Sequence, residues 1–451
     1  MKIHCKSDIR KKSKDELVDE LFDKLVENEK LKEEKEKLEK ELKKYKNPNT
    51  PSSSNKHLKP NTQGLRARSG ARRGAPMGHP GTTRRRSPVV TEVIDTDQCP
   101  RCRGKNVEDD KVLKRNTEEI PRPVVPEEKT SEIHIKKCND CGLKFVPAHN
   151  TTPLKGRFGI NLMVMVIFIR FILRGVLRKT ATFLDSGFAF KITPASVNAI
   201  IKRVADAAEK EYEELKSRIR NAEKVYVDET SFSVLGKNQW VWVFRTTSDI
   251  LLVIRPSRGS NVLEEILGKD YAGVVICDCW RAYNFLSKTA LIQRCWAHLL
   301  RKSGDLCNTV PGRHLHEKLL TLFEEIENFN TANPTDRQRL LKYKKMTAQL
   351  EKLTTYYSRY EHLTKVVKYV NFNLENWFTC IKVAGIEPTN NFAEQAIRET
   401  VMVRKIIGAF RSETGKQNYE TLASLIATWQ LSGLDLKTQL RQMLVKNLCF
   451  C

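Results

Sequence analysis

Length, composition and charge exclude several classes of protein before any motif is considered. The chain has 451 residues, which suggests about three structural units, and 40% of them are hydrophobic, so a sizeable core can be buried. Lys and Arg number 79 against 54 Asp and Glu, a formal net charge of +25 that favours an anionic polymer, nucleic acid first, as the partner.

Hydropathy and cysteine usage indicate a cytoplasmic protein. No apolar run follows the basic residues at the start of the chain, so we expect no secretory signal. The most apolar stretch, from Ile160 to Leu177, is interrupted by two arginines, an asparagine and a glycine, which predicts a core helix rather than a membrane span. Twelve cysteines, with two close pairs, then indicate a metal site rather than a disulfide framework.

The first 95 residues contain two segments of biased composition. Residues 1–46 are rich in Lys and Glu, and apolar residues occupy most seam positions of a heptad register; this predicts a short coiled coil and a homo-oligomer, with a solvated single helix as the alternative. Residues 47–95 cannot bury a core, so we expect a basic disordered linker. Its arginines include Arg84, Arg85 and Arg86. They either keep a flexible tether in solution or bind DNA phosphates, and the overall positive charge favours DNA binding.

Two C-x-x-C pairs lie within residues 96–150. Cys99 and Cys102 form the first pair, and Cys138 and Cys141 form the second. Each pair brings two thiolates within reach of one ion, and together they make the four-sulfur tetrahedral site that Zn²⁺ prefers. We therefore expect a zinc-ribbon-like module that depends on its metal to fold and that contacts DNA or a partner.

Residues 151–221 are predicted to be helical. A helix, a Gly-containing turn and a second helix opened by "TPAS" follow the order of a helix-turn-helix domain, whose second helix would place Lys202 and Arg203 on DNA. Helices that only pack against one another show the same pattern, so contact with DNA in this region stays open.

Residues 222–300 change to short apolar runs separated by turns. Three runs, a helix-like segment and a fourth run ending at Asp278 predict three antiparallel strands, a crossover helix and a parallel fourth strand. This is the α/β arrangement of ribonuclease H-like nucleotidyl transferases. Asp228 occupies the first strand at a position where alternation expects burial, so it needs a partner or a cation. Asp278 on the adjacent strand would help it to hold two divalent ions.

A third carboxylate, Glu394, lies in residues 385–413, which we expect to complete the core. A helical insertion is expected over residues 301–384 before it, and a helical C-terminal tail over residues 414–451 after it. Two structural alternatives explain Glu394 without catalysis: a capping box with Asn391, and an i, i+4 pair with an arginine.

Four motifs resemble the DDE transposases of the insertion sequence 66 family, in this order: "VDET", "CDCWRAY", "QRCWAHLLRK" and "GIEPTNNFAEQAIRETVMVRK". Members of that family likewise open with a coiled coil and continue through a linker and a zinc-binding C-x-x-C module, so the resemblance covers nearly the whole chain. It implies that Asp228, Asp278 and Glu394 are an acidic triad that binds Mg²⁺ or Mn²⁺. It also matches Cys295 and His298 to the family's C-x-x-H motif, for which we expect a packing role, since two ligands alone would make an unusual metal site.

The resemblance implies a transposase that cuts DNA at the ends of an insertion sequence and joins the freed 3′ end to a target by two-metal in-line phosphoryl transfer, and the positive charge agrees with a DNA partner. We expect double-stranded DNA as the partner of a cytoplasmic, nucleoid-associated complex, and no membrane contact. The resemblance also implies accessory proteins of the same element as further partners. The basic residues expected to hold phosphates after Glu394 are Arg398, Arg404, Lys405 and Arg411. The alternatives are a catalytically inactive, transposase-derived DNA-binding repressor and a ribonuclease H-like nuclease that does not join ends.

Overall fold

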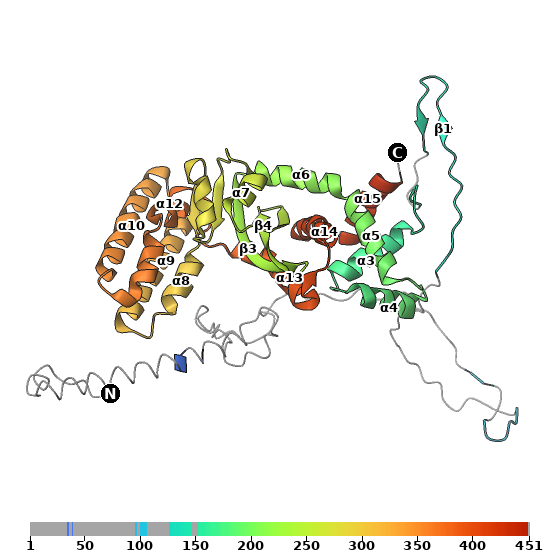
Figure 1. Cartoon of the computed structure of the whole chain (residues 1–451), viewed down its shortest axis with the longest axis horizontal. Coiled ribbons are helices and arrows are strands. Elements are labelled where there is room, and N and C mark those ends of the chain that lie inside the picture. The colour runs from blue at the N-terminus through green and yellow to red at the C-terminus, as the bar shows by residue number, and fades with distance from the viewer. Residues whose placement is uncertain are drawn as a thin grey trace, which may run out of the picture. The chain divides into compact units, whose positions relative to one another are not determined.

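The computed structural model describes residues 34–35, 38, 95–96, 100–105, 126–146 and 152–449 (Figure 1). By its contacts the chain separates into a unit of residues 52–126 and a second unit formed by the remainder. The predicted coiled coil lies outside the described residues except for helical residues 34, 35 and 38, and so does nearly all of the predicted linker.

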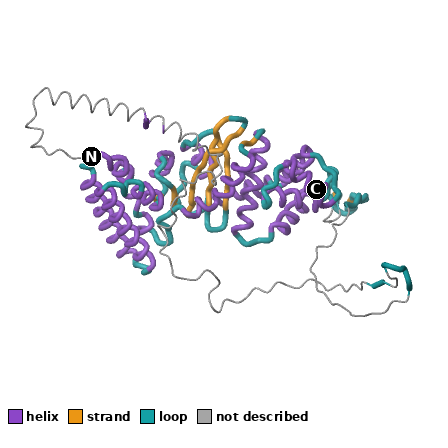
Figure 2. Tube along the Cα trace, turned by 90° about the horizontal axis from the view of Figure 1, so that it is seen from below, coloured by secondary structure: helices purple, strands orange, loops and turns teal. Residues whose placement is uncertain are grey.

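A six-stranded mixed sheet forms the centre of residues 152–449, with helices on both sides (Figure 2). Its strands are β3 (Lys224–Val234), β4 (Lys237–Arg245), β5 (Ile250–Arg255), β6 (Val274–Cys277), β7 (Leu291–Arg294) and β8 (Ala409–Phe410). The strand order is β5-β4-β3-β6-β7, and β8 pairs with β3. β3, β4 and β5 are antiparallel neighbours, whereas β6 is parallel to both β3 and β7. Helix α7 (Ser260–Leu267) connects β5 to β6, so the predicted meander, crossover helix and parallel fourth strand are confirmed.

Helices precede, interrupt and follow the sheet. Before it come α3 (Ile160–Phe171), α4 (Leu177–Phe188), α5 (Pro194–Ala207) and α6 (Glu209–Arg220). Between β7 and β8 lie α8 (Trp296–Gly304), α9 (Val310–Thr331), α10 (Asp336–Tyr357), α11 (Thr364–Asn371), α12 (Thr379–Lys382) and α13 (Asn391–Ile407). After β8 come α14 (Glu413–Leu431) and α15 (Leu436–Leu448). The short 3₁₀ segments are η3 (Arg281–Lys288), η4 (Glu361–Leu363) and η5 (Leu374–Trp377), and a separate small hairpin joins β1 (Lys136–Lys137) to β2 (Lys144–Phe145).

The most apolar stretch of the chain forms a core helix, as predicted, but only over its first part. In α3, Met163, Val166 and Ile167 are completely buried. The helix ends at Phe171, and Arg174 adopts a left-handed backbone conformation with φ of 55° before α4 begins. No helix among the described residues is long and apolar enough to cross a membrane.

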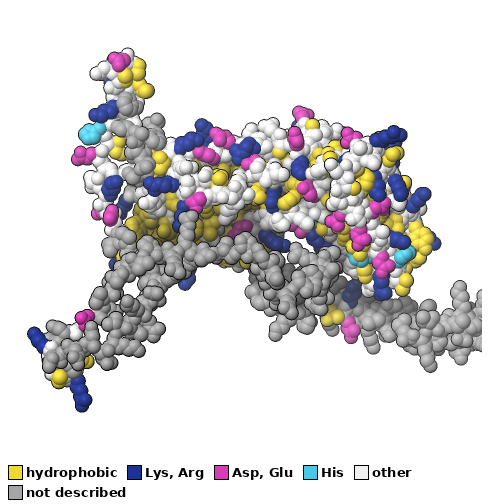
Figure 3. Space-filling model, turned by 180° about the vertical axis from the view of Figure 1, so that it is seen from behind, with side chains coloured by type: hydrophobic (Ala, Val, Ile, Leu, Met, Phe, Trp, Pro, Cys, Tyr) yellow, Lys and Arg dark blue, Asp and Glu magenta, His cyan; other side chains and the backbone are white. Residues whose placement is uncertain are grey.

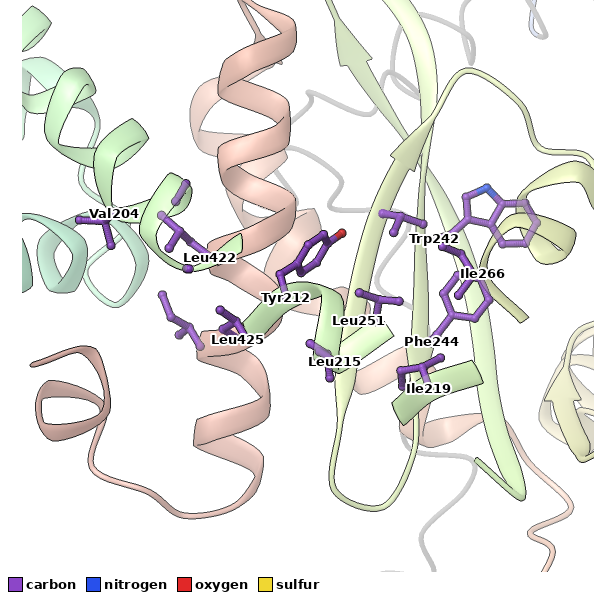
Figure 4. Packing of buried hydrophobic residues seen from close by; sticks show 14 of the residues in the cluster. Val204, Tyr212, Leu215, Ile219, Trp242, Phe244, Leu251, Ile266, Leu422 and Leu425 are labelled. Carbon is purple, nitrogen blue, oxygen red and sulfur yellow. The ribbon is translucent and has the colours of Figure 1, made fainter. Parts of the chain in front are cut away.

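Alternation along β3 divides the core into two clusters. Val225 and Val227 face one cluster, in which Tyr212 and other side chains of α6 pack against β4 and β5 (Figure 4). Tyr226 belongs to the second cluster, on the opposite face, together with apolar residues of α8 and α13. By alternation Asp228 points to the same side as Tyr226, as the sequence predicts, so it faces the α13 side of the sheet.

Helix α14 covers the edge strand β5 with polar side chains. The backbone N–H groups of Ile250 and Leu252 donate to the hydroxyls of Thr428 and Ser424, at 3.0 and 2.8 Å, and a Glu420 oxygen accepts the next free N–H of the strand at 3.0 Å. These three side chains are four residues apart on the helix, so they lie in one row along the strand. The helix thereby supplies the hydrogen bonds that a further strand would make, and β5 is not an open edge.

Candidate active site

Asp228 and Asp278 lie side by side because of strand register. β3 and β6 pair in parallel with a constant offset, Lys224 beside Val274 and Tyr226 beside Ile276. Continuing that register places Asp278, the first residue after β6, beside Asp228. The Oδ1 atom of Asp278 accepts the N–H of Trp280 at 2.8 Å, which fixes the carboxylate at the start of the following loop.

The third predicted carboxylate, Glu394, is positioned by the way α13 begins. Asn390, the residue before the helix, is completely buried, and its side-chain amide donates to the carbonyl of Val227 at 2.8 Å, one residue before Asp228. Its backbone N–H donates to the Sγ atom of Cys295 at 3.1 Å. These two contacts tie the first turn of α13, which contains Glu394, to β3 and to the start of α8.

Neither structural alternative for Glu394 is found. The helix begins after Asn390 without a side-chain cap, and Asn391, the residue predicted to form the capping box, is already the first residue of the helix. The partner of Glu394 is not the arginine four residues later: its Oε1 atom accepts a hydrogen bond from Nη2 of Arg301 at 2.6 Å and lies 3.5 Å from Nδ1 of His298.

The electrostatics of Asp228 set it apart from an ordinary carboxylate. Burial raises its pKa to about 7, with further contributions from the negative charges of Glu229, Asp278 and Glu394. The N–H of Glu229 donates to its Oδ1 atom at 3.0 Å and opposes the shift. Glu229 and Glu394 form ion pairs with Arg258 and Arg301. Among the described residues no basic side chain forms an ion pair with Asp228 or Asp278, so the two aspartates have no compensating cation.

Glu229 is a buried acid that was not among the predicted site residues, although it belongs to the "VDET" motif. It points to the face opposite Asp228, where its carboxylate accepts hydrogen bonds from Nε of Arg258 at 2.9 Å and from the hydroxyl of Tyr283 at 2.6 Å. Burial and the charge of Asp278 raise its pKa. The sequence did contain a signal for it. Two consecutive residues of a strand point to opposite faces, so when both are acids one of them must face the core.

An arginine between two tryptophans holds the loop after Asp278. The guanidinium of Arg258 lies 4.5 Å from the ring centre of Trp240 and 4.1 Å from that of Trp280, while the indole N–H of Trp280 donates to the Arg258 carbonyl at 2.8 Å. Because Arg258 also binds Glu229, these contacts connect β3 to the segment that carries Asp278.

Cys295 and His298 occupy the start of α8, beside the acids. Cys295 is buried and, through the contact with Asn390, packs α8 against α13, which is the role predicted for it. His298 has a side chain 24% exposed, and burial followed by the charge of Arg301 lowers its pKa.

The predicted DNA-contacting residues fall into three groups. Arg84, Arg85 and Arg86 lie outside the described residues. Arg203 and Arg404 donate to backbone carbonyls, those of Lys155 and Ser231, so each is engaged within the fold. The remaining predicted contacts are exposed: Lys202, which pairs with Asp206 at 2.5 Å, and Arg398, Lys405 and Arg411.

The order helix, turn, helix is confirmed as local structure, but the turn contains no glycine, because Gly187 lies in the last turn of α4. Thr193 caps α5 by accepting the N–H of Ser196 at 3.1 Å, and Pro194 occupies the first turn. However, α5 contacts α3, α4, α14 and α15, so much of its surface is covered by other helices.

The predicted zinc ligands are described only in part. Cys99 lies outside the described residues, and Cys102 belongs to the unit of residues 52–126, in an exposed turn. In the other unit, Cys138 and Cys141 lie in the turn between β1 and β2, where backbone N–H groups of Cys141 and Asp140 hydrogen-bond the Cys138 sulfur and lower its pKa. A turn whose N–H groups stabilise a thiolate suits metal ligation.

Comparisons with known proteins agree with the resemblance seen in the motifs. The model of the transposase IS66 family matches residues 155–418. Two proteins of Sinorhizobium fredii are similar to the chain: the uncharacterized protein y4qI, 25% identical over 264 residues (51% of this chain and 48% of y4qI), and the uncharacterized protein y4hP, 22% identical over 372 residues (73% and 66%). The chain therefore spans about half the length of y4qI and about two thirds of y4hP.

Proposed function

The chain belongs to the transposase IS66 family, and from that premise we propose that it cuts and joins DNA at the ends of an insertion sequence by metal-dependent in-line phosphoryl transfer. One observation carries the proposal: Asp228 is partly buried and has no ion pair, and strand register sets Asp278 beside it. Buried negative charge of this kind is costly unless a cation compensates it.

The proposed catalytic core is ribonuclease H-like. In its support, the strand that carries Asp228 is central in the sheet, and the strand that precedes Asp278 is its parallel neighbour. Glu394 then comes from the first turn of α13, which packs on β3 and β4. Side chains on adjacent strands and on a helix anchored to them keep their separations, which phosphoryl transfer requires.

The donor set fits divalent ions of the magnesium class. Carboxylate oxygens of Asp228, Asp278 and Glu394 are the ligands that Mg²⁺ and Mn²⁺ prefer. When bound, two such ions would activate the attacking oxygen and stabilise the leaving oxygen. Glu394 can exchange its present partner for an ion, because the side chain of Arg301 is 54% exposed and can move into solvent.

The chain's own residues orient the acids and the DNA. Glu229 and Arg258 hold the loop that follows Asp278 from the opposite face of the sheet. The two aspartates would therefore keep their relative positions when DNA binds. Arg398, Lys405 and Arg411 follow Glu394 and would bind phosphates, and their exposure supports this role.

Further parts of the chain complete the proposal. Zn²⁺ bound by Cys99, Cys102, Cys138 and Cys141 would fold a module that contacts DNA, and the lowered pKa of the Cys138 thiol supports this ligand role. A homo-oligomer formed through residues 1–46, and accessory proteins of the same element, are the proposed protein partners.

The test is the variant Asp278→Asn in an assay of cleavage and strand transfer with Mg²⁺ or Mn²⁺, on duplex DNA taken from the sequences that flank the gene. We expect DNA binding to be retained and both reactions to fall by more than about 100-fold, since each bound ion contributes several kcal/mol to the transition state. Asp270→Asn, an exposed aspartate shortly before β6, is the matched control and should keep full activity. Equal activity of the two variants would overturn the proposal.

The ion pair between Glu394 and Arg301 favours a second candidate, a transposase-derived repressor that binds DNA without cutting it. In that protein Arg301 would hold Glu394 permanently. Metal-dependent cleavage by the unmodified chain excludes this candidate, and sequence-specific binding without cleavage under the same conditions supports it.

A further inference from the structure

We propose that Cys295, His298 and Glu394 form a second metal site, distinct in its chemistry from the aspartate pair and suited to a divalent ion of the zinc class. One ligand atom from each residue, the sulfur, a ring nitrogen and a carboxylate oxygen, lies within 4.8 Å of the other two. A single ion can therefore contact all three after small side-chain movements.

The site is built by contacts that fix its backbone. The N–H of Cys295 donates to the carbonyl of Cys277 at 2.9 Å, which anchors this residue at the end of β7. His298 follows three residues later, so the two side chains share one side of the first turn of α8. The Asn390 contact with the Cys295 sulfur, and a 3.0 Å bond from the N–H of Trp296 to the carbonyl of Pro388, hold the start of α13 against this turn.

His298 supplies an observation that packing does not explain. Its Nδ1 atom is buried and makes no hydrogen bond, although it lies 3.5 Å from an oxygen of Glu394. Buried polar atoms in folded proteins are nearly always hydrogen-bonded, and an orphaned one needs a reason. Packing accounts for Cys295 but leaves this nitrogen without a function, whereas an ion shared with Glu394 gives it one.

The mixed donor set selects the class of ion. A thiolate and an imidazole favour Zn²⁺ over Mg²⁺, which binds oxygen ligands almost exclusively. Three protein ligands leave the fourth tetrahedral position to water. On binding, the Cys295 thiol releases its proton to solvent and the sulfur lone pair forms the metal bond, while Arg301 leaves the Glu394 oxygen for solvent.

Sharing Glu394 gives the site a consequence that rests on the proposed function. An ion held by Cys295 and His298 takes an oxygen of Glu394 away from the aspartates, so zinc would oppose the magnesium-dependent reaction. The binding site itself does not depend on that reaction.

The test is a cobalt titration of the full-length, metal-free protein under reducing conditions, with Co²⁺ as a spectroscopic substitute for Zn²⁺. Unmodified protein should bind one more equivalent of Co²⁺ than Cys295→Ser, and the difference spectrum should contain a near-ultraviolet thiolate-to-cobalt band. Co²⁺ bound at the proposed four-cysteine site would contribute equally to both samples and cancel in the difference. His298→Ala should weaken the same equivalent by about 10-fold or more, the loss that even outer-shell changes produce at metal sites.

The matched control is Cys307→Ser, a partly buried cysteine outside the site, which should retain the full stoichiometry. Circular dichroism of each variant establishes that it is folded, and serine can still accept the Asn390 hydrogen bond. Identical stoichiometry and spectra for the unmodified protein, Cys295→Ser and His298→Ala would overturn the proposal. Because no DNA is present, that outcome is independent of whether the chain is a transposase.

Discussion

Asp228 is a carboxylate that the fold partly buries without a cation, and this costs stability at neutral pH. Its pKa is about 7 in the folded chain against an ordinary value of 3.8. The folded state therefore binds the proton more tightly than the unfolded state does. The stability that this difference provides is fully present below about pH 4 and is lost as the pH rises through about 7.

Replacing Asp228 by Asn should stabilise the metal-free protein, and the gain should grow between about pH 4 and about pH 7 and then stay constant. A pKa unit corresponds to about 1.4 kcal/mol, so the gain above pH 7 should reach roughly 2 to 4 kcal/mol. Thermal midpoints with chelator at about pH 5 and about pH 8 measure it. Adding Mg²⁺ at the higher pH should raise the midpoint of the unmodified protein more than that of the variant.

Asp270→Asn again serves as the control, since an exposed aspartate should show no such pH dependence. A variant Asp228→Asn that is less stable than the unmodified protein at the higher pH would contradict the burial argument.

At the scale of elements, the contact between α14 and β5 is the feature least accessible from the sequence. The segment was expected to be a C-terminal helical tail, and its serine and threonine would ordinarily be assigned to a solvent-facing side. They are buried because they hydrogen-bond the backbone of an edge strand, which lies more than 160 positions earlier in the chain. Polar residues at helical spacing do not reveal such a partner.

The edge contact predicts that Ser424→Ala is destabilising. The Leu252 N–H, which is buried, would lose its acceptor at 2.8 Å, and an unsatisfied buried donor costs about 1 to 3 kcal/mol. Chemical unfolding measures the loss, and hydrogen exchange should show faster exchange at Leu252. Thr414→Ala, at an exposed position of the same helix, should change stability by less than about 0.5 kcal/mol, and equal effects of the two variants would count against the edge contact.

Other elements could be predicted because their signals are local. Period-two alternation placed Asp228 on the correct face of β3, and the rule for crossover connections placed Asp278 at the end of a parallel neighbouring strand. Arg404 and Arg203 were predicted to bind DNA, but in the structure they donate to backbone carbonyls. The sequence could not distinguish the two situations, because a basic residue on a helix gives the same pattern in both. The surroundings of Glu394 could not be predicted either, since Arg301 and His298 come from a helix that only the fold brings beside it.

At the scale of the whole molecule, the excess positive charge is unevenly distributed. On the face that Figure 3 shows, Lys and Arg of the described residues are interspersed with Asp and Glu, and they form no continuous basic surface there. By contrast, the segment from Lys56 to Arg86 contains nine Lys and Arg and no acid. Non-specific attraction to DNA should therefore depend strongly on this segment.

Changing Arg84, Arg85 and Arg86 together to Ser tests whether the segment is a DNA-binding arm or only a tether. Each phosphate neutralised by a basic residue adds about 0.9 to the magnitude of the slope of log K against log salt, because a condensed counterion is released. If all three arginines contact phosphates, the slope should decrease in magnitude by up to about 2.7. Fluorescence anisotropy of a labelled duplex over a series of salt concentrations measures that slope.

A variant matched in charge separates a specific contact from a change in net charge. Arg337, Lys344 and Lys345 are exposed on α10, and changing them to Ser removes the same three charges from the helices between β7 and α13. Long-range attraction depends on net charge and would weaken binding equally in both variants, whereas counterion release depends on which residues touch the DNA. A smaller slope only for the Arg84, Arg85 and Arg86 variant assigns the contact to the arm, and equal slopes for both variants and the unmodified chain assign the segment to a tether.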